Sequence, residues 1–270
     1  MRSWLPGVLM VLSVLAIACG AGADQTFDQT YEVGASPSLL VGASNGDVIV
    51  RTGVDGQITV LGHITSSDNV DLDVTADGDV VTVRSSTTFS GNLLGDKAEG
   101  RVDLTITVPL ATVIEVGINT GAVTIADIQA GGHITAAAGS VTLRRVSGDF
   151  SGGTGTGDVT ISAGTGSFQF TTGVGAITFE GELVVGGFNE FETGVGDVTV
   201  TIPEDAGVRL DTTVSSGSVS NDLAIADESS APSLLGGRLS GTIGDGGAGL
   251  TIVVGIGSVR IRAATDVGRP

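Results

Sequence analysis

One short phrase recurs through the middle of the sequence: a glycine, a small or acidic residue, an aliphatic residue and usually threonine. Its copies begin at Gly121, Gly139, Gly157, Gly175, Gly196 and Gly217. A period of about 18 residues, and later of about 21 residues, is typical of stacked-repeat architectures, because so small a unit buries its apolar face only against its neighbours. The repeat therefore constrains the fold, but it does not indicate an activity.

The residues after each glycine alternate in polarity. The second and fourth positions are apolar: Val123 and Ile125, Val141 and Leu143, Val159 and Ile161, Ile177 and Phe179, Val198 and Val200. Alternation places each pair on one face of a strand, and the threonines between them on the other face. Strands stacked about 4.8 Å apart would form an inward apolar ladder and an outward threonine ladder. The glycine is explained by a chain reversal, where a side chain at positive φ would cost about 1 kcal/mol or more.

These patterns predict an all-β protein: a single-domain parallel β-solenoid with rungs of about 18–21 residues. The domain is expected to span residues 30–262 and to be most regular over 119–220. The N-terminal strands have a looser period, and Ser85 to Gly100 is interpreted as an exposed loop because it lacks alternation. Residues 222–249 are interpreted as an irregular excursion, followed by a last rung at Gly257 and a tail over 263–270.

The first 18 residues have the composition of a secretory signal peptide. They contain one cation, Arg2, and then an apolar run from Leu5 to Ala18 in which Ser13 is the only polar side chain. A run of about 14 residues fits the core of a signal peptide and is short for a membrane-spanning helix. Residues 1–18 are therefore predicted to be a signal peptide.

Cys19, the only cysteine of the chain, directly follows this segment, so no intramolecular disulfide is expected. The small residues Ala16 and Ala18 resemble the lipobox of bacterial lipoproteins, and they also fit an ordinary secretory cleavage signal. We predict that Cys19 is lipidated and anchors the protein in the membrane, with plain secretion as the alternative. Gly20 in place of aspartate favours the outer membrane, and residues 19–29 then form a tether.

The charge balance excludes one class of partner. Lys and Arg number 12 against 30 Asp and Glu, a formal net charge of −18 at pH 7. Nucleic-acid phosphates would be repelled, so no nucleic-acid partner is expected. The two histidines, His63 and His133, have no second His or Cys nearby in sequence, and we predict neither a metal site nor a cofactor.

The chain resembles the bacterial putative-adhesin family of β-strand-repeat domains of unknown function. The resemblance rests on Asp103–Pro109, on the serial Gly-[Ser/Asp/Ala]-[Val/Ile]-Thr phrases, on Val200–Leu210 followed by Ser216–Val219, and on Gly257–Val259. It covers residues 30 to 262. What the resemblance implies is a cell-envelope β-solenoid, often lipid-anchored, with no agreed enzymatic activity.

Acidic residues gather in one stretch of the sequence. They are Glu180, Glu182, Glu190, Glu192, Asp197, Glu204 and Asp205. One interpretation is a solvated face that keeps a repetitive β structure soluble and prevents edge pairing. The other is an acidic interaction face for a cationic partner or calcium. Paired carboxylates are also what a polysaccharide-active β-helix enzyme would use, so this region carries the enzyme alternative.

Other motifs give weaker signals. The segment Gly152–Asp158 is similar to a calcium-binding nonapeptide repeat, but its aspartate comes one residue late and the phrase does not recur. No G-x-S-x-G phrase surrounds a serine, so a nucleophile elbow is not expected. Four phenylalanines are assigned to the interior or to the bracing of turns: Phe150, Phe168, Phe170 and Phe191.

The sequence as a whole favours a non-enzymatic cell-envelope lipoprotein that acts as a binding, adhesion or scaffold module through a β-solenoid surface. The alternatives are a polysaccharide-active enzyme that uses carboxylates between Glu180 and Asp211, and a calcium-binding repeat protein. The expected partners are the membrane, through lipidated Cys19, and an envelope protein, a polysaccharide or a cationic partner.

Overall fold

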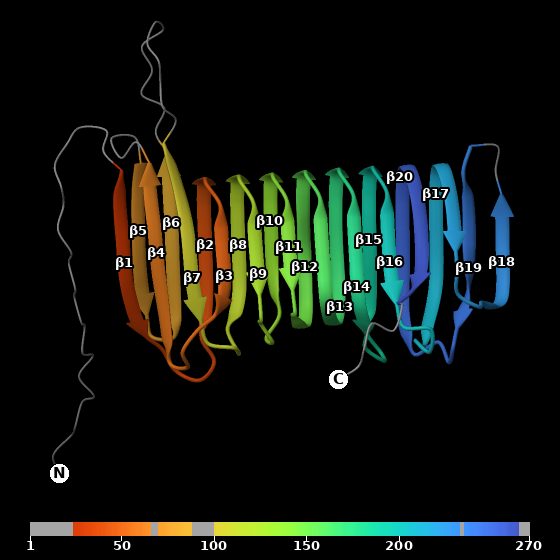
Figure 1. Cartoon of the computed structure of the whole chain (residues 1–270), viewed down its shortest axis with the longest axis horizontal. Helices are drawn as coiled ribbons and strands as arrows, with labels where there is room; N and C mark the ends of the chain where they lie inside the picture. The colour runs from red at the N-terminus through yellow and green to blue at the C-terminus, as the bar shows by residue number, and fades with distance from the viewer. Residues whose placement is uncertain (1–23, 66–69, 88–99, 233–234, 265–270) are drawn as a thin grey trace, which may run out of the picture.

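The computed structural model describes residues 24–65, 70–87, 100–232 and 235–264, and within them it contains strands and no helix. The predicted signal peptide, Cys19 and most of the predicted tail lie outside the described residues. The all-β prediction is confirmed. The strands stack side by side into one long body whose colour runs almost in order from end to end (Figure 1).

Backbone pairing divides the strands into two layers. Layer A contains β1 (Gln25–Glu32), β4 (Gln57–Thr65), β7 (Arg101–Val108), β3 (Val48–Thr52), β9 (Val123–Ala126), β11 (Val141–Arg144), β14 (Ile177–Leu183) and β16 (Val198–Ile202). Layer B contains β5 (Val70–Asp77), β6 (Val80–Thr87), β2 (Ser38–Asn45), β8 (Val113–Thr120), β10 (Gly132–Ala138), β12 (Ser147–Thr156), β15 (Phe188–Val195), β19 (Gly237–Ile243) and β18 (Ala226–Pro232). Three long strands run through both layers: β13 (Val159–Val174), β17 (Val208–Asn221) and β20 (Ala248–Ala263).

The middle of the body follows the repeat. Val123, Val141, Val159, Ile177 and Val198 pair in register across β9, β11, β13, β14 and β16, and all five are fully buried. The predicted apolar column is therefore confirmed. Each rung consists of a layer-B strand, a turn at the repeat glycine, and a layer-A strand, and neighbouring rungs pair in parallel.

The glycine turns need glycine for two reasons. Gly157 has a φ of +143°, a backbone conformation that side chains disfavour. A Cβ atom on it would also lie 2.1 Å from the carbonyl oxygen of Gly139 in the preceding rung. The stacked turns therefore leave no room for a side chain at this position.

A column of buried threonines lines the inner side of the same corner. The Oγ1 atoms of Thr154, Thr172 and Thr193 donate hydrogen bonds of 2.9 Å each to the carbonyl oxygens of Gly139, Gly157 and Gly175. Each threonine thus ties one rung to the turn of the rung before it. The sequence alone did not predict these bonds.

The opposite corner uses residues other than glycine in the left-handed region. Asp127, Arg145 and Ala163 occupy equivalent positions of successive rungs and have φ values of 64°, 49° and 52°. Arg145 donates two hydrogen bonds, of 2.7 and 2.9 Å, to the carboxylate of Asp127 in the neighbouring rung. This pair lowers the pKa of Asp127 through the hydrogen bond from Arg145.

The two ends depart from the parallel pattern. At the N-terminal end β1 pairs antiparallel with β4, β4 with β7, and β5 with β6. At the C-terminal end β19 pairs antiparallel with both β17 and β18. The sheet is therefore mixed, and the all-parallel pairing expected from the repeat holds only for the rungs between these ends. The expected irregular excursion after residue 222 instead contains the β18–β19 hairpin.

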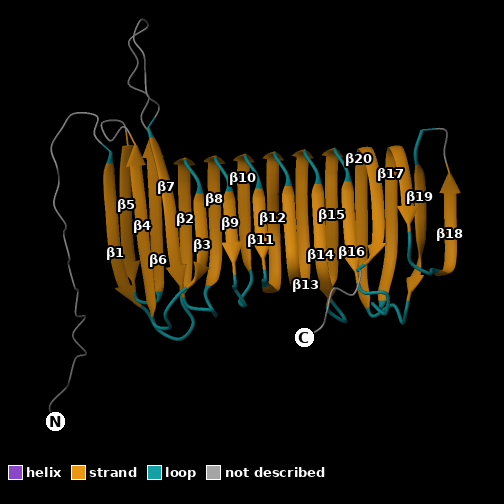
Figure 2. Cartoon of the chain, in the orientation of Figure 1, coloured by secondary structure: helices purple, strands orange, loops and turns teal. Residues whose placement is uncertain are grey.

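The order of the rungs also corrects the prediction. The rung after Gly196 was expected at Gly217, but β20 lies between them, and Gly196 N–H donates to the carbonyl of Ile256. At the other end β2–β3 lies between β6–β7 and β8–β9. The strand β20 is seen among strands that precede it in the chain (Figure 2).

Two boundaries also differ from the prediction. The predicted tether over 19–29 includes residues that belong to β1, because β1 begins at Gln25 and completes the edge of layer A against β4. The predicted loop over Ser85–Gly100 begins too early, since β6 continues to Thr87. Residues 88–99 of that loop lie outside the described residues.

Candidate binding face

The acidic stretch of the sequence does not form one face. Glu180 lies on the outward side of layer A, next to the buried Phe179, whereas Glu190 and Glu192 flank the buried Phe191 on the outward side of layer B. The rings of Phe179 and Phe191 meet in the core, with centroids 5.4 Å apart. The carboxylates beside them therefore point away from each other on opposite sides of the body.

The remaining acidic residues lie at the edges. Glu182 is exposed near the end of β14, and Glu204 and Asp205 are exposed in the turn between β16 and β17. Asp197 lies in the glycine corner before β16. The prediction of a single acidic interaction face is thus wrong. Each rung crosses both layers and both corners, so acidic residues that are close in sequence lie on two faces and two edges.

Asp197 has a structural role at its corner. Its Oδ1 atom accepts a 2.8 Å hydrogen bond from the backbone N–H of Ser258, and its Oδ2 lies 3.0 Å from Nη1 of Arg260. The hydrogen bonds from Arg260 and then from Ser258 hold the pKa of Asp197 below its ordinary value. Both partners belong to β20, so this carboxylate attaches the inserted strand.

Aspartates at the equivalent corner position of other rungs also accept a hydrogen bond from a backbone N–H. Asp47 accepts a hydrogen bond from the backbone N–H of Ala122, and Asp158 from that of Ala176, each 2.8 Å long. The aspartate that follows a repeat glycine therefore caps a free N–H of the next rung. Sequence reasoning missed this function, although the recurring Gly-Asp dipeptide was its signal.

One cation pairs with both aspartates at the N-terminal corner. Arg101 lies 2.7 Å from Asp47 and 2.8 Å from Asp103. Burial raises the pKa of Asp103, but the hydrogen bond from Arg101, the backbone N–H of Asp47 and the nearby charges of Arg101 and His63 bring its pKa below the ordinary value. His63 is thus an exposed neighbour of an ion pair, on a strand next to Asp103.

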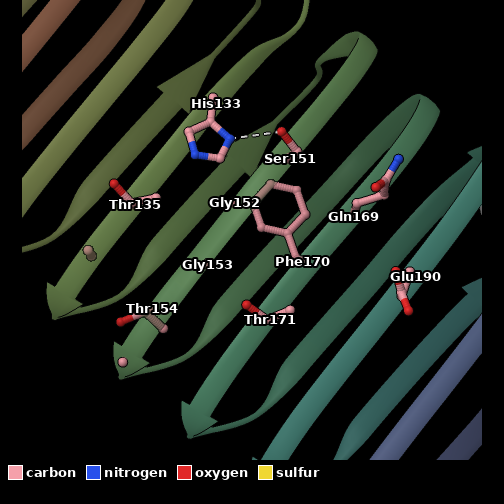
Figure 3. A pocket seen from close by; sticks show the side chains of 12 residues that line it. His133, Thr135, Ser151, Gly152, Gly153, Thr154, Gln169, Phe170, Thr171 and Glu190 are labelled. Carbon is pink, nitrogen blue, oxygen red and sulfur yellow. Dashed lines mark hydrogen bonds between the residues drawn. The ribbon is translucent and has the colours of Figure 1, made fainter.

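The outward side of layer B carries a surface hollow of about 500 Å³. Figure 3 shows its polar side chains on neighbouring strands β10, β12, β13 and β15, with His133 directed at Ser151. The Nδ1 atom of His133 and the Oγ atom of Ser151 are 2.9 Å apart. Gln169 and Glu190 continue the lining toward the C-terminal end.

The floor of this hollow is backbone. Gly152 and Gly153 lie in β12 with φ values of 139° and 158°, and a Cβ at Gly153 would come within 2.0 Å of the carbonyl oxygen of Thr171. Gly152 occupies an inward position between Ile134 and Phe170, so the ring of Phe170 reaches the floor from below. The glycine pair that suggested a calcium repeat therefore shapes a depression in the sheet.

A second hollow, of about 280 Å³, adjoins the first and shares His133 and Thr135 with it. Arg84, Glu115 and Gly117 are among the residues that line it. Across both hollows one column of outward residues pairs in register, at the spacing of about 4.8 Å that separates neighbouring strands. We call this column the polar strip; it consists of Glu115, His133, Ser151, Gln169 and Glu190.

The carboxylates of the polar strip are not paired as those of a glycosidase are. Each hollow is lined by one carboxylate, Glu190 in the first and Glu115 in the second. Three rungs lie between the two carboxylates, which puts them much farther apart than the roughly 5–10 Å that separates the paired acids of glycosidases. The strip also offers imidazole, hydroxyl and amide groups, which both donate and accept hydrogen bonds, and carboxylates, which accept them.

The calcium interpretation has no support from the geometry. The carboxylate of Asp158 is engaged by the N–H of Ala176, and no group of three His, Cys, Asp or Glu side chains is placed to hold a metal within the part of the chain that the structure describes. The phenylalanines assigned to the interior are found there. Phe150, Phe168, Phe170 and Phe191 are all buried.

Among the described residues, no helix is long and apolar enough to cross a membrane. The apolar run from Leu5 to Ala18 lies outside them, so the signal peptide and the lipidation of Cys19 stay predictions.

Comparison with known proteins gives structural neighbours. No protein-family model matches the sequence, and no curated protein matches it. A putative cell adhesion protein from Clostridium sporogenes is 13% identical, with a TM-score of 0.41 over 89% of this chain and 100% of the other. A putative adhesin from Bacteroides fragilis is 12% identical, also with a TM-score of 0.41, over 89% of this chain and 98% of the other. Other structural neighbours are described as putative adhesins, and one is described as a putative lipid binding protein.

Proposed function

We propose that this chain is a non-enzymatic binding module of the cell envelope, which uses the outward face of layer B to hold a polysaccharide. The observation that carries the proposal is the polar strip, a row of in-register polar side chains from Glu115 to Glu190 that follows two connected hollows. Every residue of the strip is exposed or half-buried, so its polar groups are accessible to a ligand that lies along the face.

The architecture suits this function. We propose that the stacked rungs constitute a parallel β-solenoid with antiparallel ends, in which each rung satisfies the backbone of the next. A rod of this kind fixes side chains at regular intervals along its axis, so a polymer with a regular repeat can contact several rungs at once. Many weak contacts then add up to useful affinity without a deep pocket.

The chemistry of the face favours carbohydrate over peptide. The backbone N–H and C=O groups of a sheet face are already paired with neighbouring strands, so only side chains are free to contact a ligand. Hydroxyl groups of a sugar both donate and accept, as do the imidazole, hydroxyl and amide groups of the strip. The net charge of −18 opposes anionic polymers, and we therefore propose a neutral glycan.

The proposal is tested by binding of the purified protein to immobilised envelope polysaccharide. His133→Ala and Gln169→Ala remove two polar groups of the strip, on either side of Ser151, and should each weaken binding several-fold. Thr142→Ala and Thr160→Ala, on the outward side of layer A, provide matched controls that should bind normally. Equal affinity of all four variants would exclude the polar strip as the contact surface, and failure of the unmodified protein to bind the polysaccharide would exclude the proposed ligand.

We also propose that Cys19 is lipidated and holds the module at the outer membrane. The support is the apolar run before Cys19 and its small flanking residues. Cys19→Ala should release the protein from membrane fractions into the soluble fraction. Retention of the variant in membranes would contradict the anchor.

A further inference from the structure

Strand β20 is unusual because it is inserted between strands that precede it in the chain. One wall of its slot is β15 and β16, the other wall is β17, and only the turn over residues 203–207 joins the two walls. The segment 222–247 then separates the end of β17 from the start of β20. Both walls are therefore complete in the chain before the strand that separates them.

The walls also match each other without β20. Gly175, Gly196 and Gly217 are equally spaced in the sequence, so a direct pairing of β17 with β15 and β16 would place Gly217 on Gly196 and Val219 on Val198. Inward residues would stay inward, because the offset is the same along both strands. The slot can thus close on itself, and loss of β20 would not leave two unpaired edges.

Side chains explain why β20 is inserted. Its large inward residues are Leu250, Ile252, Val254, Val259 and Ile261, and all five are buried. The matching positions of β17 include Asn221 and also Thr212, whose buried hydroxyl has no hydrogen-bond partner among the described residues. The apolar strand therefore gains more from the central position, and the partly polar strand is better placed toward the end.

The link to β20 contains three glycines. Gly244 and Gly246 in the turn between β19 and β20 have φ values of 57° and 70°, and Gly247 follows them. Glycines adopt many backbone conformations at little cost, which is the property of a hinge. A strand that enters a self-closing slot through such a hinge is suited to exchange between copies.

We propose that β20 is an exchangeable strand and that its slot also accepts the β20 of a second copy of this chain. This inference does not depend on the proposed glycan function. Exchange of β20 would join two copies by the same contacts that each copy makes with its own strand, so no new surface is required.

The contacts of the slot identify the second copy as the partner. Asp197 binds Arg260 and the N–H of Ser258, which is a charge match in a chain that has few cations. Asn189, fully buried, donates to the carbonyl of Gly249. A Cβ at residue 257 would lie 1.9 Å from the carbonyl of Gly196, so the entering strand needs glycine there. The β20 of a second copy meets all these requirements.

Cysteine cross-linking between copies tests the proposal. Thr201 of β16 and Arg262 of β20 are partners in register on the outward side of layer A. In the full chain with Cys19→Ser, we would introduce Thr201→Cys in one preparation and Arg262→Cys in another, mix them, incubate below the unfolding temperature and oxidise. Exchange predicts a disulfide-linked heterodimer that accumulates with time and exceeds both homodimers several-fold.

Two controls decide the result. Thr124→Cys and Thr142→Cys form the matched pair, since they are also partners in register on layer A but lie on β9 and β11, which follow the chain order. A single chain with both Thr201→Cys and Arg262→Cys should form an internal disulfide, and once oxidised it should no longer exchange. Heterodimer at or below the level of the Thr124 and Thr142 pair would overturn the proposal, provided that the internal disulfide forms.

Discussion

The middle rungs and the two ends of this protein are built by different rules. In the middle, β9, β11 and the first part of β13 follow one another at the period of the repeat and pair in parallel, equivalent residue on equivalent residue. At the ends, pairing becomes antiparallel and spatial order departs from chain order: β2–β3 lies between β6–β7 and β8–β9, and β20 lies between β15–β16 and β17. The repeat thus determines the middle, whereas burial determines the ends.

The difference teaches what a repeat can specify. When the units are alike, no unit has a better partner than the next one in the chain, so consecutive rungs pair with each other. A terminal rung has one face without a neighbour, and antiparallel strands or a less apolar sequence are then favoured there. The predictions below compare a central position with an end position, or a position constrained by stacking with one that is free.

The largest expected effect is in the aromatic core. The ring of Phe179 lies 5.2 Å from that of Phe168 and 5.4 Å from that of Phe191, centroid to centroid. Phe179→Ala should lower the free energy of unfolding by about 3–5 kcal/mol, because it leaves a cavity between the layers. Phe27→Ala, in the end strand β1 where the ring is only partly buried, should lower it by about 1–2 kcal/mol. Urea denaturation measures both, and equal losses would mean that the ends are packed as firmly as the middle.

Next in size is a glycine of the central corners. Gly157→Val places a side chain where φ is +143° and where the carbonyl of Gly139 occupies the space, so we expect a loss of about 3 kcal/mol. Gly42→Val in β2 is the matched control, since a Cβ there meets no atom within 4 Å. It should change the free energy of unfolding by less than about 0.5 kcal/mol. An unaltered melting temperature for Gly157→Val would contradict the stacking of turns.

Much of the middle could be predicted from the sequence. Val123, Val141, Val159 and Ile177 form one column because alternation within a rung and recurrence between rungs both depend only on local spacing. The repeat glycines were found by the same reasoning. Buried positions require apolar residues, and turns with positive φ favour glycine. Both features therefore recur in the sequence and could be predicted without a structure.

The ends and the candidate site could not be read in this way. The place of β20 depends on a comparison of the inward residues of two strands, Ile261 against Asn221, and on a long connection whose path the sequence does not specify. The acidic group was misplaced because Glu180 and Glu190 are close in the chain but belong to opposite layers. The hydrogen bond of His133 with Ser151 follows from register across rungs, and neither residue was singled out with the other.

Buried threonines should show opposite signs in the middle and at the end. Thr172→Val removes the hydroxyl that donates to the carbonyl of Gly157 and should lower the free energy of unfolding by about 1 kcal/mol. Thr212→Val removes a buried hydroxyl that has no hydrogen-bond partner within the described part of the chain, and it should raise the free energy of unfolding by about 1 kcal/mol. Urea midpoints compare the two variants. A loss at Thr212 would show that its hydroxyl is hydrated or bonded in solution.

The smallest effect distinguishes a carboxylate that holds β20 from one that only caps a turn. The hydrogen bonds from Arg260 and Ser258 lower the pKa of Asp197 in the folded protein. The Asp197 carboxylate therefore stabilises the fold above the unfolded pKa of about 4, and this stabilisation is lost as pH falls through the lower folded pKa. Asp197→Asn should therefore cost less than about 1 kcal/mol at pH 7, as is usual for an exposed ion pair, and the difference from the unmodified protein should shrink toward pH 2. Asp158→Asn is the control, because the carboxylate of Asp158 accepts a hydrogen bond from the N–H of Ala176, and an amide oxygen can accept the same bond. The opposite result is an equal loss of stability in the two variants at pH 7 that persists in acid. That result would show that the corner aspartates act alike, and that the ion pair with Arg260 does not stabilise the position of β20.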